Sequence, residues 1–353
     1  MIEIDGSAGE GGGQVLRTAL SLSAWRQQPV LITGIRARRR QPGLKAQHLT
    51  AVAMIAQLCD ARVEGGEPGS TTLAFRPGAV HGGATAFAVG TAGATTLVAQ
   101  AALPPLWAHG LQAELTISGG THVAWSPPVD HLRDVFAPTV IRLGLPIEVE
   151  LVRYGFYPRG GGRIKVTLSA PAPAAAPAAE PRAIVWERPA RRRIRVDATA
   201  LVAGLPRHIA ERMLATAGRS LRAKHWRARE RILEVPGGPG AYLFIRISTA
   251  ADAIAEDGYI AGGFIGLGAP GKPAEVVAEE AVGEALGFLA SEAALDSRLA
   301  DQIVLPALAA RRCVSFLTPR VSRHLQTNAA TLARFLGPCV EISGEGRVTV
   351  RPG

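Results

Sequence analysis

An alanine- and proline-rich stretch divides the chain into two parts of unequal length. Residues 170–182 read APAPAAAPAAEPR, a low-complexity composition that is typical of a linker between folded segments. With 353 residues, the chain is long enough to form two hydrophobic cores. We therefore predict a domain boundary at this stretch.

Strand and helix signals alternate on both sides of the linker. Before it, a strand at residues 2–4 precedes a helical pattern over 13–25, and a second strand and helix follow at 30–35 and 42–59. A further helix is expected at 129–143. After the linker we expect a smaller module with strands at 194–198, 232–235 and 242–247 and helices at 206–221 and 274–289. Such alternation predicts an α/β (α+β) fold.

The composition indicates a soluble protein with a polyanionic partner. There are 39 Lys and Arg against 29 Asp and Glu, and the resulting charge of +10 attracts polyanions at long range. Three cysteines without CxxC spacing and a start without a leader segment predict a cytoplasmic protein. Residues 81–112 carry no Asp, Glu, Lys or Arg, but Gly, Thr, Gln and a Pro-Pro pair interrupt them, so we expect a buried strand and helix and no membrane span.

A glycine-rich segment near the amino terminus predicts an anion site. Residues 4–17 read IDGSAGEGGGQVLR, and the helical pattern begins directly after the glycines. Glu10, Gln14 and Arg17 can then converge on one pocket that suits a phosphate and a bound metal. No Lys-Ser/Thr pair closes a Walker loop, and no acid follows at the spacing of a dinucleotide-binding unit. An ordinary strand-to-helix turn remains the alternative.

A second basic segment strengthens the prediction of a phosphate site. Residues 35–49 read IRARRRQPGLKAQHL and place Arg36, Arg38, Arg39 and Arg40 before a helix that Pro42 is expected to open. Arginines this close together repel each other unless they are solvated or face an anion, and the guanidinium fork matches phosphate oxygens. A solvated basic loop is the alternative.

These two segments and four others, in this order, resemble the RNA 3'-terminal phosphate cyclase family. The matching blocks read GEGGGQVLR, IRARRRQPGLKAQHLTA, GTAGATTLVAQAALPPLW, GFYPRGGG, LADQIVLPALA and HLQTN, and they span nearly the whole chain. The resemblance implies an enzyme that transfers AMP from ATP to a histidine, passes it to an RNA 3'-phosphate, and lets the 2'-hydroxyl displace AMP to leave a 2',3'-cyclic phosphate.

The resemblance also implies an architecture. The large domain is expected to contain three repeated two-helix, four-stranded units, built from residues 1–182 and 293–353, with 170–182 as the linker. Residues 183–292 are expected to form a smaller inserted thioredoxin-like α/β domain without catalytic residues. A homodimer is left open.

His324, in the HLQTN block, matches the family's nucleophile. A nucleophilic imidazole must be neutral, and its ordinary pKa of about 6.5 is lowered further by positive neighbours such as Arg320 and Arg323. We expect a helix just after His324, capped by Thr327 or Asn328, to add another positive helix end.

Other residues take predicted roles by their match to the family. Glu10 resembles a carboxylate that binds Mg²⁺ or Mn²⁺. The remaining matches are expected to hold phosphates, the nucleotide or the RNA end, or to orient the histidine, and they comprise Gln14, Arg17, Arg36, Arg39, Gln47, Gln100, Pro127, Asp301 and Gln302. The roles of Asp301 and Gln302 are not separable at this level.

The sequence departs from the family pattern where adenine is expected to lie. His131 and Arg298 stand where an aromatic residue is expected. Imidazole or guanidinium planes can also cover a base, so ATP use is not excluded. The preference for ATP over another nucleotide stays open. The segment His122–Trp125 is unusual. We expect His81, His109, His122, His208 and His225 to be solvated or singly satisfied histidines without a role. A non-catalytic RNA-binding or ribosome-assembly protein on this fold, and an enzyme that adenylates other nucleic-acid ends, are the alternatives.

Overall fold

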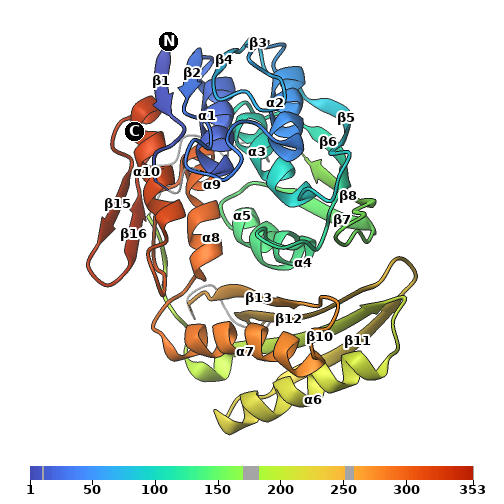
Figure 1. Ribbon diagram of the computed structural model, residues 1–353. Coiled ribbons are helices and arrows are strands. Elements are labelled where there is room, and N and C mark those ends of the chain that lie inside the picture. Colours follow the sequence, from blue (N-terminus) through green and yellow to red (C-terminus); the bar gives the residue numbers. More distant parts are fainter. Residues whose placement is uncertain (10–11, 170–182, 251–257, 353) are drawn as a thin grey trace.

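The computed structural model describes residues 1–9, 12–169, 183–250 and 258–352. Within them, the strands form four four-stranded mixed sheets, which confirms the predicted α/β class. Buried apolar side chains gather in two clusters: a large one that the first three sheets share with part of the fourth, and a smaller one within the fourth sheet and its helices. Figure 1 shows the fourth sheet and its helices below the other three.

The first sheet is built by the amino-terminal residues. Its strands are β1 (Ile2–Asp5), β2 (Val30–Thr33), β4 (Leu73–Arg76) and β3 (Arg62–Glu64), in the order β1-β2-β4-β3. β1 and β2 run parallel, whereas β4 pairs antiparallel with both β2 and β3. Helices α1 (Gly13–Arg26) and α2 (Ala46–Leu58) connect these strands. The parallel pair therefore needs α1 as its crossover.

The second sheet repeats this strand order as β5-β6-β8-β7. The sequence runs through β5 (Gly83–Ala88), α3 (Thr95–Ala108), β6 (Ala113–Gly119), α4 (Val129–His131), the π-helix η1 (Leu132–Phe136), α5 (Ala137–Ile141), β7 (Ile147–Arg153) and β8 (Gly162–Leu168). The helix expected at 129–143 is thus one helical run with a π segment in its middle. α3 continues through Pro104 and Pro105, whose missing N–H groups interrupt its bonding pattern without ending it.

The third sheet, β15-β16-β14-β9, joins segments that lie far apart in the sequence. Its elements are β9 (Ile184–Trp186), α8 (Ser297–Gln302), α9 (Val304–Ala309), β14 (Val314–Leu317), α10 (Arg323–Leu336), β15 (Val340–Ser343) and β16 (Arg347–Val350). β9 pairs parallel with β14, so the chain enters this sheet before it leaves for the fourth. The predicted boundaries at 182/183 and 292/293 stay a prediction, and β9 lies just inside the segment that they assign to the insertion.

The inserted module, which we define as residues 191–290, lies between β9 and α8. It contains the 3₁₀ helix η2 (Arg191–Arg193), β10 (Ile194–Ala203), α6 (His208–Ala223), β11 (Ala228–Val235), β12 (Gly240–Thr249), β13 (Ala261–Leu267) and α7 (Ala274–Ala290). Its sheet has the order β11-β10-β12-β13, and both long helices cover one face (Figure 1). β13 at the sheet edge was not expected from the sequence.

Two local predictions were wrong in their details. Helix α2 begins at Ala46 and not at Pro42, because Gly43 takes a left-handed φ of 78° and the Leu44 N–H bonds to the Ser70 carbonyl instead of entering a helix. β3 was not expected, since its three residues are too short to give a periodic pattern. Among the described residues no helix is long and apolar enough to cross a membrane.

Helix packing in the three-sheet part determines where a site can form. α1 packs against α2, α3 and α10, and α3 also packs against α9. α1 buries side chains around most of its circumference, including Leu16, Leu20 and Leu22. It therefore forms the centre of this part, and its amino-terminal turn lies next to residues of α2, α8 and α10.

Candidate active site

A cavity of about 2250 Å³ is lined by residues of the three-sheet part and of the inserted module. Most of the predicted site residues line it, although they come from distant segments: Gln14, Arg17, Arg36, Arg39, Gln47, Gln100, Pro127, Arg298, Asp301, Gln302 and His324. Glu10 lies outside the described residues, so the predicted metal carboxylate stays a prediction. The described part of the chain contains no group of three His, Cys, Asp or Glu side chains that could hold a metal ion.

His324 is connected to Asp301 through the side-chain amide of Gln14. The Gln14 Nε2 group donates to both carboxylate oxygens of Asp301, at 2.8 and 2.9 Å, which fixes the orientation of the amide. Its Oε1 atom is then turned toward His324 Nδ1 and hydrogen-bonds to it. Because an amide oxygen only accepts, Nδ1 carries the proton and the lone pair of the ring is on Nε2. The arrangement selects the tautomer that a nucleophilic histidine needs.

Two further side chains, which the sequence did not identify as site residues, hold Asp301 in place. Asn328 Nδ2 hydrogen-bonds to Asp301 Oδ1, and Thr18 Oγ1 donates to Asn328 Oδ1 at 2.7 Å. Both are buried. The match to HLQTN contained Asn328, but a residue in a matched block gives no sign of what it contacts.

The expected caps of the last long helix were wrong. Ser322 is the N-cap of α10 and accepts from the Leu325 N–H at 3.0 Å, so His324 lies inside the first turn and not before the helix. Thr327 instead donates to the Arg323 carbonyl at 2.7 Å, and Asn328 is used by Asp301. The positive end of α10 nevertheless lies at His324, as the prediction required.

Three arginines face the cavity from α1 and from the loop before α2. Burial lowers the pKa of Arg17 to about 10, against the opposing effect of the Asp301 charge, so Arg17 remains protonated at neutral pH. Burial and the neighbouring Arg39 lower the pKa of Arg36. Arg36 also donates from Nη1 to the carbonyls of Gln41 and Gly43, each at 2.9 Å, which pins this loop. Arg17, Arg36 and Arg39, which were predicted to hold phosphates, thus line one cavity near the start of α1.

His48 lines the same cavity, and the sequence analysis gave it no role. Its Nδ1 accepts from the Lys45 N–H at 3.1 Å, so the proton of the neutral ring is on Nε2, close to the Gly13 backbone. Burial first, and then the charges of Arg17, Arg36 and Lys45, lower the pKa of His48 to about 3. His48 therefore offers an uncharged N–H donor among the arginines. One indication of a role for His48 was present in the sequence: it directly follows Gln47, which was a predicted site residue.

Glutamines from three elements complete the cavity wall. Gln47 Oε1 accepts from the Ala94 N–H at 3.2 Å and so links α2 to the start of α3. Among the described residues, Gln100 Nε2 and Gln302 Oε1 are buried atoms without a hydrogen-bond partner. An orphaned buried donor and acceptor in one cavity wall favour a polar ligand that would satisfy both.

Comparisons with known proteins identify the family of the chain. The family model described as RNA 3'-terminal phosphate cyclase matches residues 8–342. The chain is also 44% identical over 362 residues to a protein of Methylococcus capsulatus named RNA 3'-terminal phosphate cyclase, covering 99% of this chain and 93% of that protein. This chain belongs to the RNA 3'-terminal phosphate cyclase family.

One residue that the cyclase resemblance assigned to the nucleotide pocket lies elsewhere. His131 is completely buried, and its Nε2 is 3.2 Å from Asp296 Oδ2, so its ring is not exposed to a ligand in the cavity. Asp296 is also the N-cap of α8 and accepts from the N–H groups of Arg298, Leu299 and Gly263. His131 thus supports the helix that carries Asp301 in this cyclase-family chain. The sequence could not reveal this, because Asp296 is distant in the chain.

Arg298, the other departure from the cyclase pattern, does line the cavity. Its guanidinium binds Glu284 of α7 at 2.8 and 3.1 Å. This ion pair ties the inserted module to α8 and keeps the planar group at the cavity wall. Nucleotide preference at this position stays a prediction.

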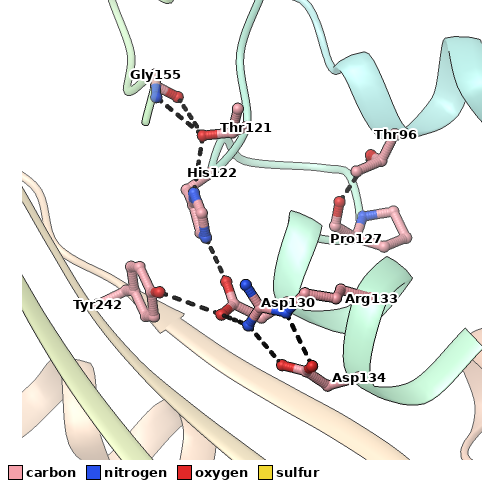
Figure 2. Close-up of polar contacts among 9 residues, drawn as sticks. All are labelled: Thr96, Thr121, His122, Pro127, Asp130, Arg133, Asp134, Gly155 and Tyr242. Atoms are coloured by element: carbon pink, nitrogen blue, oxygen red, sulfur yellow. Dashed lines mark hydrogen bonds and ion pairs between the residues drawn. The ribbon is translucent and has the colours of Figure 1, made fainter. Parts of the chain in front are cut away.

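His122 is hydrogen-bonded, as one of the two expectations for it allowed, but it does not lie at a surface-like position. This histidine is buried, its Nε2 lies 2.5 Å from Asp130 Oδ2, and its ring stacks on Tyr242 at 4.5 Å between centroids (Figure 2). Asp130 also accepts from Arg133 and from the Tyr242 hydroxyl. Since Tyr242 belongs to β12, the cluster joins the second sheet of this cyclase-family chain to the inserted module. A sequence shows neither the burial nor the distant ring.

Proposed function

We propose that this protein is an ATP-dependent RNA 3'-terminal phosphate cyclase that acts through a covalent histidinyl-AMP. The proposal rests chiefly on one observation: the Asp301–Gln14–His324 chain leaves the lone pair of His324 on Nε2, in a cavity lined by Arg17, Arg36 and Arg39. An unprotonated nitrogen beside several guanidinium groups is suited to attack a phosphorus atom. Family membership supports the same chemistry.

In the first step, His324 Nε2 forms a bond to the α-phosphorus of ATP, and the bond from that phosphorus to the bridging oxygen breaks. Pyrophosphate leaves, and the arginines and the His48 N–H stabilise the negative charge on the phosphate oxygens. Gln14 Oε1 and Asp301 stabilise the positive charge that develops on the imidazole without taking its proton. Gln100 and Gln302 offer a donor and an acceptor to the nucleoside.

In the second step, an oxygen of the RNA 3'-phosphate attacks the same phosphorus and displaces His324 Nε2. In the third, the neighbouring 2'-hydroxyl oxygen attacks the phosphorus of the RNA phosphate, loses its proton, and AMP leaves. The product is a 2',3'-cyclic phosphate.

Mg²⁺ or Mn²⁺ held by Glu10 belongs to the proposal and would supply charge neutralisation of the triphosphate. The free cysteines Cys59, Cys313 and Cys339 support a reducing, cytoplasmic location.

The test is incubation of the protein with ATP labelled at the α-phosphate. We expect a protein–AMP bond that is labile in acid and stable in alkali, absent in His324→Ala and present in the control His208→Ala, whose histidine is exposed on the inserted module. Adding a 3'-phosphorylated RNA should release the label as AMP and yield the cyclic end. Label retained by His324→Ala would contradict the assignment. Labelled protein that ignores 3'-phosphorylated RNA would favour adenylation of other ends.

A further inference from the structure

Two aromatic side chains are exposed at the cavity, although aromatic residues are scarce in this chain. Trp125 is 101% exposed and Tyr157 is 78% exposed, and both line the cavity that contains His324. Among the described residues, they are the only aromatic side chains in the set of exposed large apolar ones. Leaving an indole in water forfeits the free energy of burying it, so its exposure beside a binding cavity points to a ligand.

The loops that carry the two side chains are anchored to each other. Thr121 Oγ1 accepts from the Gly155 N–H at 2.9 Å, and His122 forms a β-bridge with Phe156. Trp125 follows the first of these segments and Tyr157 the second.

The far end of the Trp125 loop is held as well. Thr96 Oγ1 donates to the Pro127 carbonyl at 2.8 Å (Figure 2), and Ser126 Oγ donates to the Val123 carbonyl at 3.1 Å. The Trp125 side chain is therefore presented from a fixed backbone. A loop of this kind loses little entropy when a ligand binds.

The backbone at Trp125 takes an unfavourable conformation. Its φ is 67°, in the left-handed region that bulky residues rarely adopt. Glycine would fit this position without strain. Strain that persists at a binding cavity is a reason to look for a function of the side chain that causes it.

We propose that Trp125 and Tyr157 form a stacking site for bases of the RNA strand that leads to the 3'-phosphate. The inference rests on the proposed function, because that function places the terminal phosphate among the arginines of the same cavity. A polymer must leave the cavity through its mouth, where exposed aromatic rings can cover successive bases. Arg159, exposed two residues after Tyr157, adds a positive charge for the backbone.

The geometry favours RNA bases over the adenine of ATP as the occupant. The partnerless buried atoms of Gln100 and Gln302 lie in the cavity wall and suit an enclosed nucleoside, whereas Trp125 is fully open to solvent. Stacking on two exposed rings tolerates any base. An enzyme that processes RNA ends of varied sequence needs such recognition. Base contacts would thus be confined to the nucleotides nearest the end.

The decisive variant is Trp125→Gly, which removes the ring and also relieves the backbone strain, so the fold is retained. We expect the Kd of a short single-stranded 3'-phosphorylated RNA, measured by fluorescence anisotropy, to rise about tenfold. The rate of protein–AMP formation without RNA and the KM for ATP should be unchanged. Trp125→Phe should restore most of the affinity. Tyr157→Ala should weaken RNA binding in the same way as Trp125→Gly.

An RNA with abasic riboses next to its 3'-phosphate gives the matching ligand control. It should bind the wild-type protein at least as weakly as intact RNA binds Trp125→Gly, and the substitution should weaken it no further. Equal RNA affinity of wild type and Trp125→Gly, or an increase in the KM for ATP instead, would overturn the inference. The binding measurement does not depend on catalysis. A protein that forms no AMP adduct yet shows the Trp125 effect would contradict the proposed function alone.

Discussion

Among the histidines that are connected to carboxylates, His324 and His122 are connected differently. His324 reaches Asp301 through the Gln14 amide, at a cavity that spans the three-sheet part and the inserted module. His122 contacts Asp130 directly at 2.5 Å, in a buried cluster beneath the Tyr242 ring. The His324 residue is exposed, whereas the side chains of His122 and Asp130 are buried.

The difference shows what a neutral spacer accomplishes. A carboxylate in direct contact, as in the buried pair, places its negative charge beside the imidazole ring. Burial raises the pKa of Asp130, but the hydrogen bond and charge of His122, together with Arg133 and Tyr242, outweigh it and lower the pKa overall. At His324 the Gln14 amide lies between the ring and Asp301. The amide orients the ring, while the negative charge of Asp301 does not touch it. The amide thus sets the tautomer of His324 without a direct contact between the ring and the carboxylate.

The largest effect should come from Asp301→Asn, which removes the carboxylate that orients the Gln14 amide. An asparagine can donate to Gln14 Oε1, so the Gln14 amide can turn its NH₂ toward His324 Nδ1. The ring would then carry its proton on Nε2 and lose its nucleophilic lone pair. We expect protein–AMP formation to slow on the order of a thousandfold, within the range for misplaced proton transfer groups. Single-turnover labelling with ATP measures it.

The contrast requires that Asp130→Asn behave differently in the same assay. Its carboxylate contacts no cavity nucleophile, and we expect its adenylation rate to stay within about threefold of wild type, as for a substitution away from the reacting groups. If Asp301→Asn adenylates at a normal rate while remaining folded, the Gln14 connection does not control the tautomer of His324.

How far the sequence could predict this site depends on whether a role is local or is set by distant partners. An anion site was predictable because dense arginines and a glycine-rich helix start already imply one. The resemblance to the family then singled out Arg17, Arg36 and Arg39, which line one cavity. The matched block fixed His324 by position. Its connection to Asp301 was expected only as one of two roles, because spacing in the chain does not reveal which amide lies between them.

The residues that sequence reasoning missed or misjudged depend on long-range packing. His122 looked like a loop histidine, yet the Tyr242 ring that covers it comes from the inserted module. His131 looked like a substitute for an adenine-stacking ring, yet it bonds to Asp296, far along the chain. The mixed α/β class was predictable from periodicity, whereas β3 and β13 were not, since short or edge strands carry too little pattern.

The next prediction concerns Asp130, in the buried pair with His122. Asp130→Ala should lower the free energy of unfolding by about 3 kcal/mol, because it leaves the charge of Arg133 and the His122 N–H without their buried acceptor. Urea unfolding followed by far-UV circular dichroism measures the change. Asp134→Ala is the matched control, because Asp134 binds the same Arg133 at a more exposed position, and we expect a loss below about 1 kcal/mol. Equal losses for both variants would mean that the Asp130 cluster adds no stability beyond a surface ion pair.

The smallest expected effect concerns His48, a third histidine that is buried without any carboxylate. Its folded pKa of about 3 lies below its ordinary value of 6.5, so between these pH values the unfolded chain binds a proton that the folded protein does not. Stability from this group is therefore fully present above pH 6.5 and is lost as the pH falls toward 3, by about 2 kcal/mol at pH 5. His48→Gln should be less stable at pH 7 but should lose less between pH 7 and pH 5 in urea unfolding.

The exposed His208 supplies the control for that measurement, since His208→Gln should leave the pH dependence of the wild type unchanged. A His48→Gln variant with the full wild-type loss on acidification would mean that His48 becomes charged in the folded state. It could then not act as an uncharged N–H donor among the arginines of the cavity. The pH slope therefore tests whether the surroundings of His48 keep its imidazole neutral, whereas Asp301→Asn tests which nitrogen of the neutral His324 ring carries the proton.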